Sequence, residues 1–333
     1  MTAARPAGAD PYQPYRSTLL PPERVRALSR LRPAIVVRDV ALCWTAILAA
    51  WAVAAAWPAW WVRGLAAVVV GTRYYALFII AHDGLHRRLW PTRRANDLFT
   101  DACILGAIGA ITRLNNHNHL LHHRLLGSPG DPDRYRHACA DKADRLHFVG
   151  FLSGLASVAR AIHAVFLAPH GPRRPHEGAS PREGYAARDV AILLAWQVAL
   201  VGGLTWAFGW WGYPVMWLAP LYVFTYLADL VRSFAEHSHP EGDADADHHR
   251  LVTFESHPLE RYFLAPMHMN RHVAHHLWTG IPYYNLPRAD AESLAHPAAA
   301  TLERRGTYLA YLLRYWLALP LEPCRRAAAP GDA

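Results

Sequence analysis

Four long runs of apolar residues separate the chain into membrane-spanning and polar parts. They cover approximately residues 39–62, 63–81, 190–211 and 212–230, and they occur as two adjacent pairs. Each run reaches or approaches the roughly 20 apolar residues that a membrane-spanning helix needs. A buried helix of a soluble protein rarely stays apolar on all sides over such a length. The pattern therefore predicts an all-α integral membrane protein with four transmembrane helices arranged as two hairpins.

Three shorter stretches outside these runs also have a recognisable pattern. Residues 101–112 are apolar but too few to cross a bilayer, so we expect a re-entrant or interfacial segment there. Residues 148–168 are interrupted by Arg160 and His163. That interruption favours an interfacial amphipathic helix, with a fifth span as the alternative. Residues 308–321 predict a last amphipathic helix that lies on the membrane.

The charge distribution predicts which side of the membrane each part occupies. The 333-residue chain has a formal net charge of +8, and arginines gather before the first span and between the two hairpins. The turn inside each hairpin is short and rich in Trp and Tyr, which favour the membrane interface. Because basic loops remain cytoplasmic, we expect both termini and the central polar region inside the cell. Residues 1–37 would form a basic, flexible cytoplasmic arm, helical near residues 22–28 and not cleaved, before a membrane domain of residues 38–333.

Three clusters of histidine dominate the polar part of the chain. Within each cluster the histidines lie three or four residues apart, so they share one face of a helix and can direct their ring nitrogens to one point. Neutral imidazole binds zinc, copper, iron and nickel near neutral pH. All three clusters fall on the predicted cytoplasmic side, which predicts a metal site there. The clusters are His82 and His86 (HxxxH), His119, His122 and His123 (HxxHH), and His272, His275 and His276 (HxxHH).

In order, spacing and position these motifs resemble the membrane fatty-acid desaturase superfamily, which includes acyl-lipid desaturases, hydroxylases and carotenoid ketolases. The resemblance extends from about the second span to Pro287. It includes Asp83 inside the first box, Asp-Pro-Asp at 131–133 and Tyr-Asn-Leu-Pro at 284–287. The segment Arg-Ser-Phe-Ala-Glu-His at 232–237 also looks like a family feature. The resemblance implies two iron ions (Fe²⁺/Fe³⁺), held almost wholly by histidine in a cytoplasmic helical cap, with O₂ as co-substrate.

The resemblance also implies which residues hold the iron ions. A catalytic zinc has three protein ligands and a structural zinc has four, so nine candidates fit two metals better than one. No catalytic residue beyond these ligands is expected. The implied ligands are His82, His86, His119, His122, His123, His237, His272, His275 and His276.

Further residues are expected around the ligands. Ser233, one helical turn before His237, would face the same iron through a water molecule. Metal-bound imidazoles usually donate their other N–H to a carboxylate or a carbonyl. The nearest carboxylates in sequence are Asp83, Asp131, Asp133 and Glu236, and the alternative for each is a helix cap or a surface charge. Asn270, two residues before the third box, is expected to help orient that box.

The implied reaction is the O₂-dependent desaturation of a fatty acyl chain of a membrane lipid. Such an iron pair can remove hydrogen from an unactivated methylene, which no side-chain acid or base can do. A hydroxylase or ketolase of a lipid or carotenoid is an alternative on the same site. We expect electrons from a separate ferredoxin-like or cytochrome b5-like donor with its reductase, docked on the basic face. Because no nucleic-acid-binding motif accompanies the positive charge, we expect no nucleic acid partner.

One departure from the family pattern and two other classes of protein bear on this interpretation. Many relatives have Glu before the last His-His pair, where this chain has Ala274, and the change could alter the substrate or the outcome of the reaction.

If the chain were a membrane metal transporter or sensor, we would expect ionisable residues along a path inside the spans. Only Arg73 lies in the middle of a predicted span, and Asp229 lies at the end of the fourth. A metalloprotease is disfavoured because the sequence has no HExxH motif.

Overall fold

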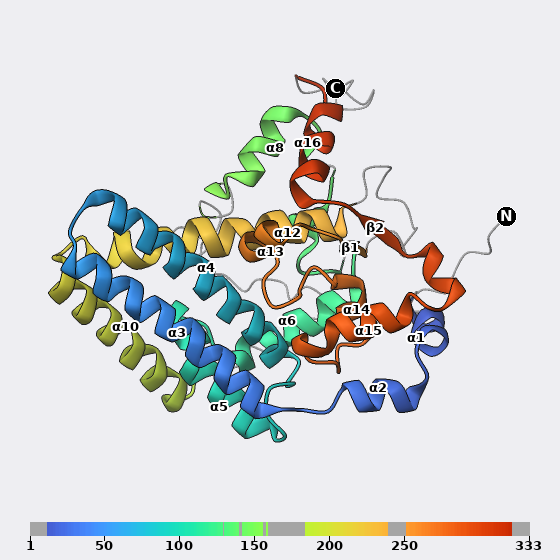
Figure 1. Cartoon of the computed structure of the whole chain (residues 1–333), viewed down its shortest axis with the longest axis horizontal. Coiled ribbons are helices and arrows are strands. Elements are labelled where there is room, and N and C mark those ends of the chain that lie inside the picture. Colours follow the sequence, from blue (N-terminus) through green and yellow to red (C-terminus); the bar gives the residue numbers. More distant parts are fainter. Residues whose placement is uncertain are drawn as a thin grey trace, which may run out of the picture.

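The structure is a computed structural model that describes residues 12–128, 130–139, 142–155, 158, 184–238 and 251–321. Four of the described helices are long and apolar enough to cross a membrane. They run along one another on one side of the molecule, and shorter helices gather beyond their ends (Figure 1). The long helices are α3 (Pro33–Ala56), α4 (Trp60–Leu85), α10 (Ala187–Phe208) and a composite helix at Pro214–His237.

The first two long helices differ from the predicted spans at both ends. α3 begins at Pro33 instead of residue 39, and proline suits the first turn of a helix. α3 ends at Ala56 because Pro58 disfavours helical backbone at the residue before it, and Trp57 is extended. α4 continues beyond residue 81 to Leu85, so the apolar helix carries its own polar last turn into the neighbouring helices.

The fourth long helix is irregular around Pro220. Two π-helical segments, η4 (Pro214–Leu218) and η5 (Tyr222–Leu227), flank the short α11 (Ala219–Leu221). A proline inside a helix has no N–H to donate, and its ring crowds a carbonyl of the preceding turn. The wider π turns accommodate this disturbance. Regular α-helix resumes in α12 (Ala228–His237), which extends past the predicted end of the span at residue 230.

One aromatic cluster connects all four long helices. The ring of Trp44 in α3 stacks on that of Trp196 in α10, with centroids 4.9 Å apart. Tyr74 in α4 meets Trp217 in η4 edge to face, also at 4.9 Å. Trp44, Tyr74 and Trp196 also donate hydrogen bonds to the carbonyls of Cys103, Ile104 and Ala102. The cluster therefore satisfies carbonyls that the end of the next helix leaves open.

Residues 101–112, for which the sequence predicts a re-entrant or interfacial segment, form a turn between two helices. They comprise the end of α5 (Arg93–Cys103), a 3-10 turn η1 (Leu105–Ile108) and the start of α6 (Thr112–Leu125). Gly109 has a positive φ of 77°, which favours glycine. Asp101 accepts a hydrogen bond of 2.7 Å from the Thr112 backbone N–H, which closes the turn. The turn directs α6 back across the end of α4.

The described part of the N-terminal segment, from residue 12, is packed and contains two helices in place of a flexible arm, and the helix expected near residues 22–28 is present. Tyr12, Leu19, Leu20 and Leu28 are buried. The Arg16 guanidinium donates a 2.7 Å hydrogen bond to the carbonyl of Leu277. Alternation of apolar and basic residues is typical of a solvated arm as well as of a docked helix, so only the tertiary contacts distinguish them. The two helices of this segment are α1 (Gln13–Leu19) and α2 (Pro22–Leu28).

The remaining elements surround the ends of α4 and α12. They include a two-stranded parallel sheet in which Val252 pairs with Glu303, so the described chain is mostly helical and not all-α. The predicted helix at 308–321 is present as α16. The predicted helix at 148–168 overlaps α8, and most of its residues lie outside the described part of the chain. These elements are α7 (Arg134–His137), α8 (Arg145–Leu152), β1 (Val252–Phe254), α13 (Pro258–Leu264), α14 (His272–Leu277), η7 (Tyr283–Asn285), α15 (Leu286–Ser293), η8 (Pro297–Thr301), β2 (Glu303–Arg305) and α16 (Tyr308–Ala318).

Candidate metal centre

Four helices bring all nine predicted histidines to one place. The first box lies at the end of α4, the second on α6 and the third on α14, and His237 is the last residue of α12. Within each helix the histidines occupy the three- and four-residue spacing that places them on one face. Because the last turn of α4 and the α12 segment are the polar ends of two long apolar helices, the histidines lie directly beyond the bundle.

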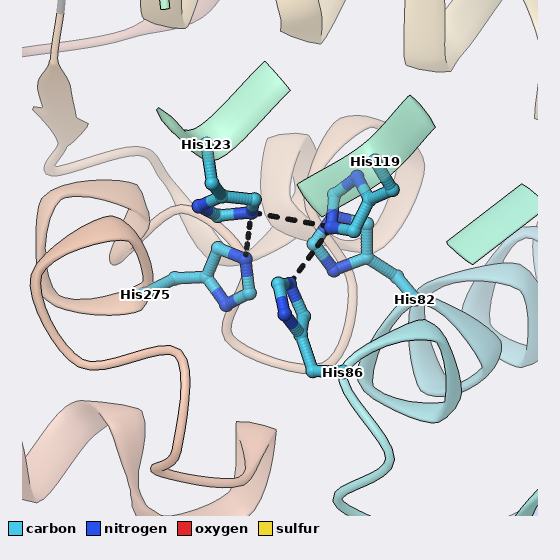
Figure 2. Close-up of side chains that lie close together, drawn as sticks. All are labelled: His82, His86, His119, His123 and His275. Carbon is cyan, nitrogen blue, oxygen red and sulfur yellow. Dashed lines mark hydrogen bonds between the residues drawn. The ribbon is translucent and has the colours of Figure 1, made fainter. Parts of the chain in front are cut away.

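Five of the histidines form one group around a common centre. Their candidate ligand nitrogens all lie within 4.8 Å of one another. Nε2 of His119 is 2.7 Å from Nε2 of His86 and 3.2 Å from Nε2 of His123. Nε2 of His123 is in turn 3.3 Å from Nε2 of His275. The close-up shows these rings, with that of His82, pointing toward one another from three different helices (Figure 2).

The other four histidines form a second group beside the first. The candidate ligand nitrogens of His122, His237 and His276 lie within 4.8 Å of one another. His272 joins them because its Nε2 is 2.9 Å from Nε2 of His237. The rings of His123 and His276 stack with centroids 4.0 Å apart, and this pair connects the two groups. The nine rings therefore form two adjacent centres.

The chemistry of these donors fits metal ions. Burial, reinforced by neighbouring rings, lowers the pKa of His119 and His123 well below the usual value of histidine. Burial also lowers the pKa of His275, to about 3. A neutral ring carries one nitrogen with a free lone pair, and four Nε2 atoms of the first group face one another in contacts of 2.7, 3.2 and 3.3 Å. A cation at each centre would accept these lone pairs, and imidazole suits iron and other transition metals.

Asp131 orients one of the box histidines. Its Oδ1 accepts a 2.9 Å hydrogen bond from Nδ1 of His122, and its Oδ2 accepts a 3.0 Å bond from Nε2 of His137. Burial raises the pKa of Asp131, but these hydrogen bonds outweigh it and hold the pKa below the usual range of a carboxyl. The proton of His122 therefore remains on Nδ1. The lone pair of its Nε2 is left free to bind a metal ion in the second group.

The neighbouring carboxylate, Asp133, is placed differently from the expectation. Its backbone N–H donates a 2.9 Å hydrogen bond to Asp131, and among the described residues its side chain contacts no box histidine. His137 shares Asp131 with the second box but is absent from the sequence-based candidates. It lies outside the three boxes and has no helical spacing to them. The Asp-Pro-Asp motif after the second box is the only signal that leads toward it.

Glu236 is the carboxylate beside the third box. Its Oε2 lies 3.2 Å from Nδ1 of His272, at ion-pair distance but without hydrogen-bond alignment. Arg232 donates to the same oxygen at 2.5 Å and to Asp229 at 2.9 Å, and Tyr308 donates to Oε1 at 2.6 Å. Arg232, to which the sequence analysis assigns no role, thus holds the carboxylate in place.

Three other predicted neighbours support the site at a greater distance. Asp83 accepts a 2.6 Å hydrogen bond from the Tyr283 backbone N–H and so ties α4 to the segment after the third box. Asn270 donates a 2.8 Å bond to the Phe254 carbonyl, which anchors the start of α14 to β1. Ser233 is buried one turn before His237, and among the described residues it has no hydrogen bond to a box histidine.

A cavity of about 520 Å³ leads from the protein surface to the junction of the two groups. His123 and His276, the stacked pair, both line it. Two arginines, Arg16 and Arg124, also line it. The three histidines of the third box are buried, and the cavity gives access to one of them, His276. The other lining residues are Val25, Leu120, Leu277, Trp278, Thr279 and Gly280.

Comparison with known proteins finds one family and two relatives. The model of the fatty acid desaturase family matches residues 58–308 of the chain. The chain is 25% identical over 243 residues to an sn-1 acyl-lipid omega-3 desaturase (ferredoxin) of Nostoc sp., which covers 66% of this chain and 64% of that protein. It is 24% identical over 255 residues to a protein of the same name from Synechocystis sp., which covers 72% of this chain and 69% of that one. The matches thus span about two thirds of the length of these relatives.

Proposed function

The chain belongs to the fatty acid desaturase family, and on this premise we propose that it is an O₂-dependent membrane oxidoreductase that desaturates a fatty acyl chain of a lipid. One observation carries the proposal: nine histidines from four helices form two adjacent groups of neutral nitrogen donors. Both relatives are named as acyl-lipid desaturases, which supports a lipid substrate. A transporter or sensor is less well supported because it needs no such enclosed pair of centres.

The two groups would each hold one iron ion. His82, His86, His119, His123 and His275 would bind the first, and His122, His237, His272 and His276 the second. When bound, an iron pair of this kind supplies the means to reduce O₂ and to remove hydrogen from an unactivated methylene.

The protein's own residues would prepare the site for this chemistry. Burial keeps the rings neutral, so metal binding at neutral pH does not require their deprotonation. Asp131 holds the proton of His122 on Nδ1, and Arg232 keeps Glu236 beside His272. The surrounding helices would limit the access of bulk water to the reacting centre.

The acyl chain would reach the site from the membrane side. His82 and His237 lie in the last turns of two long apolar helices, so a lipid tail that follows these helices arrives at the histidines. We expect an apolar passage between the bundle and the overlying helices, with the polar head group left near the membrane surface. Arrival from this side leaves the cavity at His123 and His276 available for another partner.

Expression in a host with abundant saturated and monounsaturated lipids tests the reaction. Mass spectrometry of total lipids and pigments should show O₂-dependent products lighter by two hydrogen atoms. His275→Ala should abolish these products, whereas His257→Asn, at a helix cap away from both groups, should retain them. Products heavier by one oxygen would indicate a hydroxylase. Products that gain one oxygen and lose two hydrogens would indicate a ketolase. No oxygen-dependent change with an electron donor supplied would contradict the proposal.

A further inference from the structure

The α2 helix separates the cavity that reaches the histidines from a second, strongly basic pocket. Val25 of α2 lines the first cavity, whereas the opposite side of α2 lines a pocket of about 520 Å³. Five arginines and one glutamate line this second pocket, so its charge is strongly positive. The arginines are Arg24, Arg26, Arg30, Arg32 and Arg288.

Three of these arginines have no carboxylate partner among the described residues. Arg24 and Arg288 share Glu292, with Arg288 Nε 3.1 Å from its Oε1. Arg26, Arg30 and Arg32 form no ion pair within the described chain, and all three are exposed. Guanidinium groups left exposed side by side repel one another, which is unfavourable without an anionic partner. The pocket is therefore a surface that favours an acidic ligand.

The backbone around this pocket is firmly fixed, so the arginines are presented on a rigid surface. The backbone N–H of Arg32 donates a 2.8 Å hydrogen bond to the Tyr284 hydroxyl. Asn285 donates a 2.6 Å bond to the carbonyl of Leu28. Arg16 of α1, which lines the first cavity together with Val25, holds the carbonyls of Leu277 and His276 in the third box. A partner on α2 would therefore lie beside the cavity that reaches His123 and His276.

We propose that α2 and the two pockets beside it form the docking surface for an acidic one-electron carrier, a ferredoxin-like protein. In this arrangement, which rests on the proposed function, acidic side chains of the carrier contact Arg26, Arg30 and Arg32. Its redox centre then faces the cavity whose inner wall is His123 and His276. Both relatives are named with ferredoxin, which agrees with a soluble acidic donor. Complementary charge speeds encounter and fixes the orientation of such partners.

The electron balance of desaturation requires such a partner. Formation of one double bond removes two hydrogen atoms, and with them two electrons, from the acyl chain. Reduction of O₂ to two water molecules consumes four electrons and four protons. The carrier must therefore supply the remaining two electrons, one at a time, and solvent supplies two protons. Each delivery oxidises one carrier molecule, which then has to leave, so the contact should be transient and sensitive to salt.

Charge reversal on α2 tests the surface with the full-length protein in nanodiscs. The test variant is Arg26→Glu/Arg30→Glu/Arg32→Glu, whose side chains lie outside the metal centre. The matched control is Arg94→Glu/Arg314→Glu, which reverses exposed arginines on α5 and α16. A reduced plant-type ferredoxin is titrated against each protein, first for binding and then for turnover. The same preparations are also driven by a small chemical reductant that needs no docking.

The test variant should bind ferredoxin at least about tenfold more weakly and lose most of its salt dependence, since like charges then meet at the contact. Its turnover with the chemical reductant should equal that of the wild type. Unchanged ferredoxin binding in the test variant would overturn the inference, and so would an equal loss in the control. Absence of turnover with the chemical reductant in the wild type would instead contradict the desaturase proposal. The binding measurement would still decide the docking surface.

Discussion

His122 is the box histidine whose proton the structure places most firmly. Its Nδ1 is bonded to Asp131, and the same carboxylate is bonded by His137 and by the backbone N–H of Gly127 at 2.9 Å. This carboxylate is buried, so its negative charge depends on these donors and on the backbone N–H of Asp133. Loss of the charge would free the ring of His122 to rotate or to change its tautomer.

Asp131→Asn should therefore reduce iron content or activity by about 10- to 100-fold, the usual cost of losing a carboxylate that orients a metal-binding histidine. The amide retains the shape but cannot accept at both oxygens. Iron per chain, measured after purification in one detergent, checks the effect. Asp133→Asn is the matched control and should stay close to wild type, because its side chain contacts no box histidine. Equal losses in both variants would contradict this role of Asp131.

Residue spacing predicts which histidines gather, but not all of their neighbours. Helical periodicity suffices for the boxes because their spacing alone places the rings on one face. His137 depends on how the loop at 127–133 closes around Asp131, which no local pattern encodes. Asp83 is expected to accept from a box histidine, yet its carboxylate accepts from the backbone N–H of Tyr283, 200 residues away. Tertiary contacts of this kind cannot be derived from spacing.

At the scale of elements, the site depends on close packing between α4 and the fourth long helix. A Cβ atom at Gly71 would lie 2.5 Å from the carbonyl oxygen of Pro220 and 2.6 Å from Cβ of Phe224. These contacts are with α11 and η5, so backbone would have to move to admit a methyl group. Because these two helices carry His82 and His237, their separation sets the distance between the two groups.

Gly71→Ala should destabilise the protein by about 1–3 kcal/mol, the usual effect of overpacking a tight contact. Thermal unfolding followed by circular dichroism in detergent measures the change. Gly64→Ala, on the same helix, is the control, since no neighbour lies within 4 Å of a Cβ there. It should be neutral or slightly stabilising, because alanine favours helix over glycine. A lower unfolding temperature for Gly64→Ala than for Gly71→Ala would contradict this view of the packing.

The sequence predicts an element well where its apolar composition determines the structure, and poorly where tertiary contacts determine it. The four long helices follow from their apolar runs, because few structures other than a membrane span need such length. Their ends do not, since α4 and α12 continue as polar turns that tertiary contacts stabilise. The short sheet of β1 and β2 escapes prediction because three-residue strands carry no periodic signal.

At the scale of the whole molecule, the positive charge predicts that the histidine site faces the cytoplasm. Trp60, 84% exposed at the start of α4, lies at the end of the bundle away from the histidines. Tyr185, 57% exposed, precedes α10 near the opposite end. In a background without native cysteines, Trp60→Cys should react with an impermeant maleimide in intact cells, and Tyr185→Cys only after permeabilisation. The reverse pattern would contradict the predicted orientation.

Which histidines share a centre is a property of the whole fold. Chain order suggests one group per box, but the first group takes members from all three boxes. This mixing arises because the spacing in the second and third boxes directs successive rings to different centres, and the five rings of the first group come from α4, α6 and α14 (Figure 2). The sequence therefore predicts the set of donors, and the fold divides them.

The metal content of the purified wild-type protein tests directly whether the two groups of histidine hold two iron ions. Two adjacent groups of histidine nitrogen donors should bind about two iron ions per chain, a number that separates this site from a single catalytic or structural ion. Elemental analysis of protein expressed with ample iron measures it, before and after treatment with a chelator. Close to two irons per chain are expected, and the chelator should remove both the iron and the activity. One zinc and no iron per chain would contradict this expectation.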